Sequence, residues 1–384
     1  MRVTPHGEGV FIAELYRGPT YCFKDLGLQV LLRVLSYFAT KRGARATLLV
    51  STTGDTGPAA LRAAADVNNP LLRIVCFYPE GMVSELQRKQ MTTLGASDSV
   101  RVATFEGGGD DMDAPLKRLA MDADFAARHG LCGINSYNVC RPLAQMVHYV
   151  WTYVRCCQSL ERWNGPSPTE TMVLDVLVPT GAMGNLAAAT FAKVRGVPLG
   201  ELCVACNCND VSHRAVSAGD FSKAPGDMLK TLSDAINIQL PYNFERVLYY
   251  AHDRDATRTR CAMAEVEATG GVRLAAEAVA ALASRGYRSA RVTDDRMLSA
   301  LRDFREQRGY VADPHTAVAL AAGRDSLGYF TNSFESARPA RPFVVLATAH
   351  PCKFQHAVTH ALGHDAWRAF AVLTPSTVFF KGLF

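Results

Sequence analysis

The sequence predicts an α/β protein with two layered domains. Short β-branched runs alternate with longer stretches of helical periodicity along the chain. Several runs, such as residues 342–347, are apolar throughout, as strands covered on both faces must be. The length of 384 residues also exceeds what one core of ordinary size serves. Together these features indicate helices layered on mostly parallel sheets.

The individual elements follow from the same patterns. We expect strands at the apolar, β-branched runs 46–52, 72–78, 100–105, 172–178, 202–206 and 342–347. We expect helices at the stretches of helical periodicity 25–40, 58–67, 84–94, 112–128, 142–160, 185–194 and 297–307. Residues 256–295, dense in Ala and charge, are expected to form helices on the outside of the body.

A domain crossing is expected at residues 161–170, because the Pro and Gly there cannot continue the long preceding helix. We therefore predict a smaller domain over 46–160 and a larger domain made of 1–45 and 161–384. Residues 323–341 are rich in Ser, Asn, Gly and Pro, which predicts a surface loop.

Charge and composition favour a small-molecule ligand. The chain has 41 Lys and Arg against 36 Asp and Glu, and a net charge of +5 is too dilute for a nucleic-acid surface. The sequence shows neither an apolar run of membrane length nor a secretory signal, so we expect a cytoplasmic protein without a membrane partner. Eleven scattered cysteines indicate reduced thiols in a reducing compartment.

The loop STTGDTG, residues 51–57, leaves a predicted strand and enters an Ala-rich helix. Gly54 and Gly57 are expected to free backbone N–H groups there, while the neighbouring threonines add hydroxyl donors. Such a loop can hold a carboxylate. The same pattern also fits an ordinary strand-to-helix turn with an N-cap.

The loop PTGAMGN, residues 179–185, closes an apolar strand and opens a helix at Gly184 or Asn185. This geometry directs successive amides and the helix dipole at a phosphate. The loop lacks the GK[ST] of a Walker motif and the GxGxxG spacing of a dinucleotide site. By itself it is a weak signal for a cofactor phosphate.

Lys24 lies between Phe23 and Asp25 at the start of a helical pattern. A lone lysine is usually a solvated charge, but these neighbours indicate partial burial, which favours the neutral amine that attacks an aldehyde. A nucleophilic amine together with two anion-binding loops suggests pyridoxal 5′-phosphate (PLP) as the cofactor.

Nine segments in family order make the chain similar to threonine synthases of the fungal and bacterial kind and to their threonine synthase-like relatives. These are PLP enzymes of fold type II, the tryptophan synthase β-like fold. The segments are ELYRGPTYCFKD (14–25), STTGDTGPAA (51–60), YPEGMVSELQRKQMTT (78–93), NSYNVCRPLAQ (135–145), VPTGAMGN (178–185), CNDVSHR (208–214), PYNFER (241–246), DPHTAVA (313–319) and ATAHPCKF (347–354).

The resemblance implies roles for particular residues around the cofactor. Lys24 corresponds to the lysine that condenses with the cofactor aldehyde and then moves protons. Thr348 corresponds to the threonine that faces the pyridine nitrogen, and Asp55 belongs to the loop near the phenolic oxygen. The cofactor phosphate is expected on the loop formed by Gly181, Ala182, Met183, Gly184 and Asn185.

The resemblance also implies a phosphorylated amino acid as substrate, converted from O-phosphohomoserine and water to threonine and phosphate. Its carboxylate is expected near the hydroxyls of loop 51–57. Its phosphate is expected at the NSYNVCR motif, where an arginine fork can pair two oxygens. The implied substrate residues are Thr52, Thr53, Thr56, Asn138, Arg141 and His315.

Some segments depart from the usual threonine synthase pattern. Ala182 stands where these enzymes usually carry asparagine, and Thr53 replaces a serine. Segments 181–185, 213–222 and 241–246 are closer to the animal branch, which includes phospholyases that release 2-oxobutyrate and phosphate. Such a phospholyase is therefore the alternative function.

The resemblance further implies a segment of several dozen residues ahead of the GPT motif, whereas Gly18 lies only seventeen positions after Met1. A non-catalytic relative that binds PLP therefore stays a third alternative. A monomer or a homodimer is expected.

No metal is expected. Cys203, Cys206 and Cys208 are spaced like a metal knuckle, but they fall on a predicted buried strand and are better explained as core thiols. The histidines at 356, 360 and 364 would share one helix face, which we interpret as solvated because the HExxH glutamate is absent.

Overall fold

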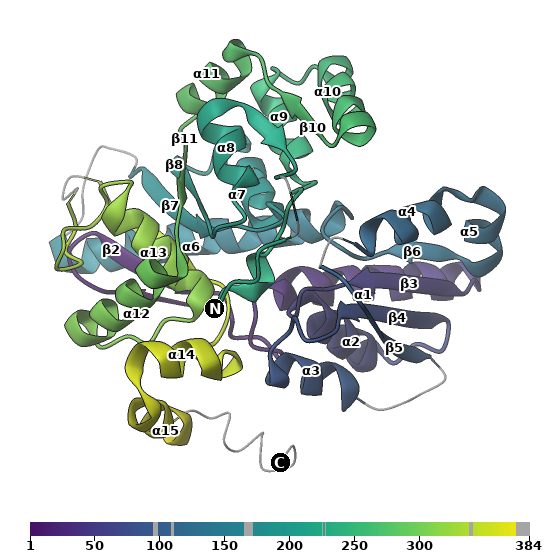
Figure 1. The fold of residues 1–384 in the computed structure, drawn as a ribbon, viewed down its shortest axis with the longest axis horizontal. Coiled ribbons are helices and arrows are strands. Elements are labelled where there is room, and N and C mark those ends of the chain that lie inside the picture. The colour runs from purple at the N-terminus through teal and green to yellow at the C-terminus, as the bar shows by residue number, and fades with distance from the viewer. Residues whose placement is uncertain are drawn as a thin grey trace.

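A computed structural model describes residues 1–94, 99–108, 111–164, 172–224, 226, 228–337 and 341–373. Within this part of the chain the strands form a six-stranded sheet, a four-stranded sheet and a two-stranded ribbon. The two larger sheets occupy the two sides of the molecule, each with helices packed on it (Figure 1). The predicted α/β class is confirmed.

The larger sheet has the strand order β1-β2-β12-β7-β8-β11. All its pairings are parallel except that of β1 with β2, which form an antiparallel hairpin. Its strands are β1 Arg2–Pro5, β2 Val10–Glu14, β7 Leu174–Pro179, β8 Leu199–Cys206, β11 Tyr287–Arg291 and β12 Phe343–Ala347.

The smaller sheet is parallel throughout, in the order β5-β4-β3-β6. Its strands are β3 Ala46–Ser51, β4 Leu72–Pro79, β5 Val100–Phe105 and β6 Leu131–Gly133. The ribbon pairs β9 Asp220–Ser222 with β10 Gly271–Arg273.

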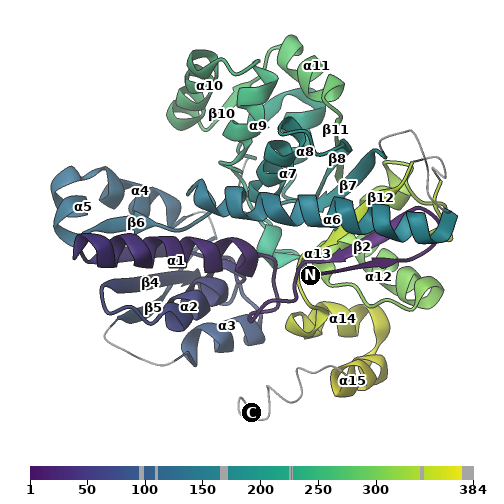
Figure 2. The same ribbon diagram turned by 180° about the vertical axis from the view of Figure 1, so that it is seen from behind.

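Helices α1 and α6 run side by side at their N-terminal ends, and α6 continues across the larger sheet (Figure 2). The helices associated with the smaller sheet are α1 Lys24–Arg42, α2 Thr56–Val67, α3 Glu85–Thr92, α4 Asp113–Met121 and α5 Ala123–His129. The others are α6 Cys140–Asn164, α7 Gly184–Val194, α8 Val211–Ala218, η1 Asp234–Ile236, α9 Phe244–Ala251, α10 Ala256–Thr269, α11 Ala276–Ser284, α12 Asp294–Arg308, α13 Pro314–Asp325, η2 Pro351–Lys353, α14 Gln355–Leu362 and α15 His364–Leu373.

Each face of the larger sheet has its own apolar core, because successive side chains of a strand point to opposite faces. Val176 and Val178 of β7 belong to one cluster, and Leu177 belongs to the other. A third cluster packs α1 and α2 on the smaller sheet. Leu28 of α1 lies in this third cluster, whereas Tyr149 of α6 lies in the first. The packing therefore groups α1 with the smaller sheet, and the predicted domain boundaries stay a prediction.

The helix expected over 112–128 is two helices. Asp122 stands between α4 and α5 in an extended conformation, and its side chain accepts a hydrogen bond of 2.9 Å from the Phe125 N–H. Aspartate in this N-cap position ends one helix and begins the next, because its carboxylate satisfies an N–H that has no partner within the helix.

Residues 256–295 are only partly the outer helices that we expected. They include β11, which pairs with β8 at the edge of the larger sheet and buries Tyr287 and Ala290. Arg288 and Arg291 of this edge strand are three residues apart, so the strand lacks the strict alternation of apolar and polar residues that predicts a half-buried strand. The short strands β1, β2 and β6 were also not predicted.

Of the surface loop expected at 323–341, residues 338–340 lie outside the described residues, and the remainder is not a simple surface loop. Helix α13 extends to Asp325, and the following segment buries Tyr329, Phe330 and Phe334 against the second core cluster. The segment is rich in turn residues, but its aromatic side chains are part of the core. The domain crossing was expected at residues 161–170. Helix α6 continues to Asn164, and residues 165–170 lie outside the described residues.

Cys203 and Cys206 are buried thiols, as expected, and the described residues include no cluster of potential metal ligands. The histidines do not share one helix, because α14 ends at Leu362 and His364 begins α15. All three histidines are exposed.

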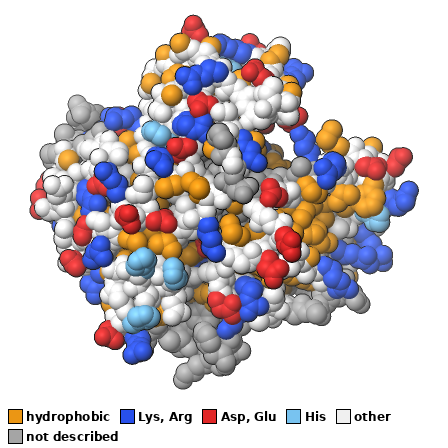
Figure 3. All heavy atoms as spheres, in the orientation of Figure 1, with side chains coloured by type: hydrophobic (Ala, Val, Ile, Leu, Met, Phe, Trp, Pro, Cys, Tyr) orange, Lys and Arg blue, Asp and Glu red, His pale blue; other side chains and the backbone are white. Residues whose placement is uncertain are grey.

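Positive and negative side chains are interspersed on the face drawn in Figure 3. Among the helices that the structure describes, none combines the length and apolar character that a bilayer span requires.

Replacing Phe330 by Ala should lower the free energy of unfolding by about 3–5 kcal/mol, the usual cost of removing a buried aromatic ring. The ring lies 5.0 Å from Phe343 and 5.1 Å from Phe334, measured between centroids. Denaturant unfolding measures the change, with the exposed Asn332→Ala as control. Equal stability of the two variants would contradict the packing described here.

Candidate active site

A pocket lies where the loops after β3, β7 and β12 meet the start of α1. Parallel strands end at the same edge of a sheet, so short loops bring distant residues together there. All but one of the predicted site residues line this pocket. They are Lys24, Thr52, Thr53, Asp55, Thr56, Arg141, Gly181, Ala182, Met183, Gly184, Asn185, His315 and Thr348.

Lys24 is the first residue of α1, and its side chain is 13% exposed. The turn before it is fixed to the larger sheet, because the Phe23 N–H donates to the Thr348 carbonyl at 2.8 Å. The ammonium group lies 3.6 Å from Asp55 Oδ2 and 5.5 Å from the centroid of the Phe23 ring. Lys24 is thus a largely enclosed amine with access to the pocket.

Loop 51–57 is held together by Thr52, whose Oγ1 accepts hydrogen bonds of 3.0 Å from both Gly54 N and Gly57 N. We expected these two amides to be free for a ligand, and that expectation was wrong because the threonine hydroxyl satisfies them within the turn. Gly54 has a φ of +128°, and a Cβ there would lie 2.4 Å from Gln87 Oε1. The loop keeps the hydroxyls of Thr53 and Thr56 at the pocket wall.

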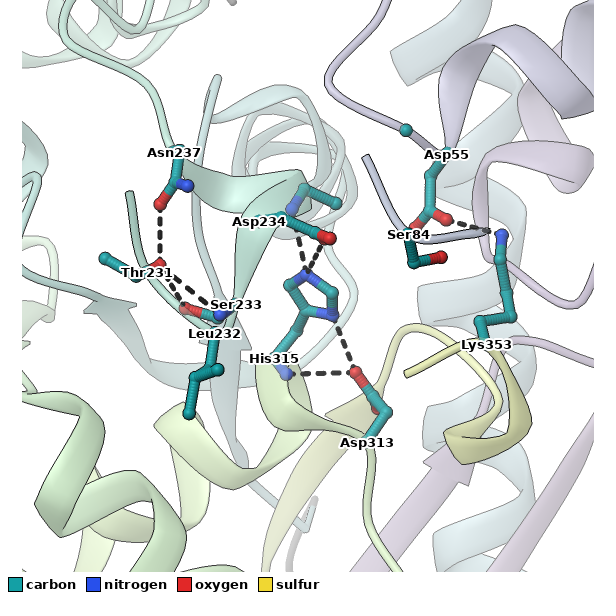
Figure 4. Close-up of polar contacts among 12 residues, drawn as sticks. Asp55, Ser84, Thr231, Leu232, Ser233, Asp234, Asn237, Asp313, His315 and Lys353 are labelled. Atoms are coloured by element: carbon teal, nitrogen blue, oxygen red, sulfur yellow. Dashed lines mark hydrogen bonds and ion pairs between the residues drawn. The ribbon is translucent and has the colours of Figure 1, made fainter. Parts of the chain in front are cut away.

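Asp55 is the charged centre of the site. Its Oδ1 accepts from Lys353 Nζ at 2.5 Å and from Gln87 Nε2 at 3.1 Å, while its Oδ2 faces Lys24. Burial alone would raise the pKa of this carboxyl, but Lys353, Lys24 and His315 together hold it below its ordinary value. Figure 4 shows Lys353 and Asp55 pointing toward each other. Lys353 was not among the site residues predicted from the sequence.

Loop 179–185 has the geometry of an anion cradle. Met183 adopts the left-handed conformation, with φ of 59° and ψ of 11°, directly before α7 begins at Gly184. The first N–H groups of a helix have no partner within it, so the start of α7 presents donors. Asn243 Nδ2 donates to the Ala182 carbonyl at 2.7 Å, and this hydrogen bond stabilises the loop.

The side-chain amide of Asn185 has hydrogen-bond partners at its oxygen but not at its nitrogen. Its Oδ1 accepts from Tyr149 OH at 2.9 Å and lies 2.9 Å from His148 Nε2. Burial lowers the pKa of His148 to about 4, so the ring is neutral and can donate to that oxygen. Within the described part of the chain, Asn185 Nδ2 has no hydrogen-bond partner although it is buried. It is therefore an unused donor in the wall of the pocket.

Arg141 is 3% exposed and lines the pocket near the N-terminal end of α6. Its Nη1 donates to the Ile134 carbonyl at 3.2 Å, whereas its buried Nε has no hydrogen-bond partner among the residues described. Burial lowers its pKa, which shows how little solvent reaches the guanidinium group. An anionic ligand group is the natural partner for this cation.

Asn138 is the predicted site residue that does not line the pocket. Its Nδ2 donates to the Gly133 carbonyl at 3.1 Å, and its Oδ1 accepts from Cys140 N at 3.2 Å. The amide therefore stabilises its own loop. Asn135 and Ser136, earlier in the same motif, line the pocket instead and were not predicted. Only the loop conformation reveals which asparagine faces inward.

His315 lies between two carboxylates (Figure 4). Its Nδ1 is 2.8 Å from Asp313 Oδ1, and its Nε2 is 3.6 Å from Asp234 Oδ1. Burial lowers the pKa of His315, but the carboxylates of Asp234 and Asp313 have the larger combined effect and raise it to about 9. The Ala235 N–H donates to the same Nε2 at 3.1 Å, so this nitrogen is an acceptor in the structure, and its protonation would place an imidazolium between the two carboxylates.

These residues fit PLP. The pocket combines an enclosed lysine, a helix N-terminus for a phosphate and a threonine, Thr348, at the end of β12. Its wall includes buried polar atoms that lack a partner among the described residues, namely Ser51 Oγ, Arg141 Nε, Gln145 Oε1 and Asn185 Nδ2. Such orphaned atoms are costly unless a polar ligand satisfies them.

Comparison with known proteins agrees with this chemistry. Residues 3–333 match the family described as pyridoxal-phosphate dependent enzyme, and residues 316–377 match the threonine synthase C-terminal family. The chain belongs to the PLP-dependent threonine synthase family. Its cofactor is pyridoxal 5′-phosphate, and its fold is that of the type II PLP enzymes.

Individual relatives cover most of the chain. It is 36% identical to human threonine synthase-like 2 over 92% of this chain and 69% of that protein. It is 31% identical to threonine synthase from Pseudomonas aeruginosa, over 91% of this chain and 69% of that protein. A PLP-bound threonine synthase from Brucella melitensis superposes with a TM-score of 0.79 at 32% identity, covering 94% of this chain and 72% of that one.

Protonation of His315 between Asp313 and Asp234 should make stability depend on pH. Its folded pKa of about 9 lies above the ordinary value of 6.5. The contribution is therefore fully present below pH 6.5 and is lost as pH rises through 9, with a total on the order of 3 kcal/mol. Denaturant unfolding of the wild type and of His315→Gln should show a stability difference that shrinks over this range. A difference that is independent of pH would contradict a charged ring.

Proposed function

We propose that the protein is a threonine synthase that converts O-phosphohomoserine and water to threonine and inorganic phosphate. The observation that carries the proposal is the buried Arg141, whose Nε lacks a partner among the described residues, in the same pocket as Lys24 and the 181–185 loop. Two anion sites beside one lysine suit a phosphorylated cofactor and a phosphorylated substrate together. Threonine synthases among the relatives support the same reaction.

In this proposal the residues 181–185 hold the cofactor phosphate through backbone N–H groups, and Asn185 Nδ2 adds a side-chain donor. Thr348 provides a neutral hydroxyl for the pyridine nitrogen. When bound, the cofactor supplies an electron sink for negative charge that develops on carbon atoms of the substrate. The protein contributes orientation, charge and proton transfer.

Lys24 is the proton carrier of the proposed reaction. Its Nζ would take one proton from Cα and, after releasing that proton to water, one from Cβ of the substrate. Protonation of Cγ once the phosphate has left, and of Cα once water has added at Cβ, would balance these two steps. The hydroxyls of Thr53 and Thr56 would hold the substrate carboxylate. This arrangement fixes the carbon atoms that lose protons next to one base.

Arg141 would hold the substrate phosphate. It is a buried cation whose Nε has no partner among the described residues, so it would stabilise the dianion that develops as the bond from Cγ to the phosphate oxygen breaks. His315 lines the same pocket, but its ring nitrogens are engaged by Asp313 and by the Ala235 N–H, so it is the weaker candidate. Asn138 has no part in this proposal, because its amide is used by its own loop. Ser136 and Asn135 are the polar neighbours that line the pocket in its place.

Product analysis tests the proposal directly. The protein loaded with PLP is incubated with O-phosphohomoserine, and threonine, 2-oxobutyrate and phosphate are quantified. Threonine and phosphate in equal amounts are expected. Release of 2-oxobutyrate would establish the phospholyase alternative, and cofactor binding without release of phosphate would establish a non-catalytic relative.

Arg141→Leu should lower kcat/KM for O-phosphohomoserine by about 100-fold, because a buried donor to a developing anion is removed. Cofactor binding should change little, since the cofactor phosphate is assigned to loop 181–185. The matched control is Arg33→Leu, which removes an exposed arginine from α1. Loss of cofactor binding in the Arg141 variant would show that this residue serves the cofactor instead.

A further inference from the structure

Lys353 provides a second buried ammonium group beside the active site. It ends the short helix η2, six residues after β12, and its side chain is 0% exposed. A buried lysine is stable only when its charge is paired and its N–H groups have acceptors. The proposed reaction does not use this cation, so its position beside the active-site pocket requires a separate explanation.

The contacts of Lys353 join separate parts of the chain. Its Nζ donates to Asp55 Oδ1 in loop 51–57 at 2.5 Å and to the carbonyl of Thr20 at 3.2 Å. Thr20 precedes Lys24 in the turn that leads into α1. Lys353 therefore ties the substrate loop to the turn that carries the reactive lysine.

The two oxygens of Asp55 have different partners. Oδ1 is used by Lys353 and by Gln87 Nε2, whereas Oδ2 faces Lys24 Nζ at 3.6 Å. Rotation of the carboxylate would break the contact with Lys353. The short ion pair on one oxygen thus determines which way the other oxygen points.

We propose that Lys353 is a positioning residue for the chemistry at Lys24: it keeps Asp55 ionised and turned so that Oδ2 faces the Lys24 amine. The carboxylate in turn aligns that amine for proton transfer. This role in turnover rests on the proposed function, whereas the ion pair itself does not.

The charged groups around Asp55 come from several elements. Lys24 and Asp25 approach from α1, His315 from α13 and Lys353 from η2. Asp25 is buried with its carboxylate on the backbone and hydroxyl of Thr20, and burial raises its pKa. Without Lys353, burial would be offset by Lys24, His315 and the Gln87 hydrogen bond, so the Asp55 carboxyl would accept a proton more readily.

The test compares Lys353→Met with Gln87→Met in the PLP-loaded protein. Both substitutions remove a donor to Asp55 Oδ1, but only the first removes a charge. If turnover needs ionised Asp55, the acid limb of the kcat/KM profile should move to higher pH by at least about one unit in Lys353→Met. In Gln87→Met it should stay within a few tenths of a unit of the wild type.

The proposal would be overturned if the acid limb stays in place in Lys353→Met, or if it shifts equally in both variants. A merely structural role of Lys353 would lower kcat/KM by the same factor at every pH. If Lys353→Met fails to fold in a thermal melt, Asp55→Asn decides the matter. This nearly isosteric variant should lose the acid limb and at least tenfold in kcat. Retention of a wild-type profile would exclude Asp55 as the group that Lys353 controls.

A readout without substrate separates this proposal from the proposed function. The visible absorbance of the bound cofactor is titrated with pH in the same variants. Its transition should move in Lys353→Met and stay in place in Gln87→Met, even if O-phosphohomoserine is not the substrate. An absorbance titration that is identical in all variants would overturn the role of Lys353 independently of any turnover.

Discussion

The site depends on one buried carboxylate held between two lysines. An ionised group inside a protein costs several kcal/mol unless it is paired, and removing one partner of a buried pair typically costs about 3–5 kcal/mol. Asp55 meets this requirement through Lys353 and Lys24, which come from opposite ends of the chain. The electrostatic constraint therefore fixes the relative positions of loop 51–57, the start of α1 and the segment after β12.

The parallel sheets make this arrangement possible. Strands β3, β7 and β12 each end at the pocket, and the segment that follows each strand supplies a different chemical function. Hydroxyls follow β3, a helix N-terminus follows β7, and a threonine with a buried lysine follows β12. Arg141 adds positive charge from α6. The pocket therefore contains a buried cation that Asp55 does not pair, as the phosphorylated substrate of the proposed function would require.

The α/β fold and the inner strands of the sheets could be predicted from the sequence, because these strands are short, apolar and buried on both faces. The edge strand β11 escaped prediction because its buried residues, Tyr287 and Ala290, are three positions apart and do not alternate with polar ones. Loops 51–57 and 179–185 were found because glycine and threonine motifs directly follow predicted strands, whereas Thr348, Arg141 and His315 were implied by the family resemblance. Lys353 could not be found in that way, since its contact with Asp55 spans 298 positions. Nor could the sequence tell that Thr52 satisfies the amides of its own loop, or that Asn138 turns away from the pocket.

The most direct measurement is to reduce the PLP-loaded protein with borohydride and to locate the cofactor adduct by peptide mapping. The account predicts a single adduct on Lys24, the enclosed amine that opens to the pocket. An adduct on Lys353, the neighbouring lysine that is fully buried, or the absence of an adduct would contradict it.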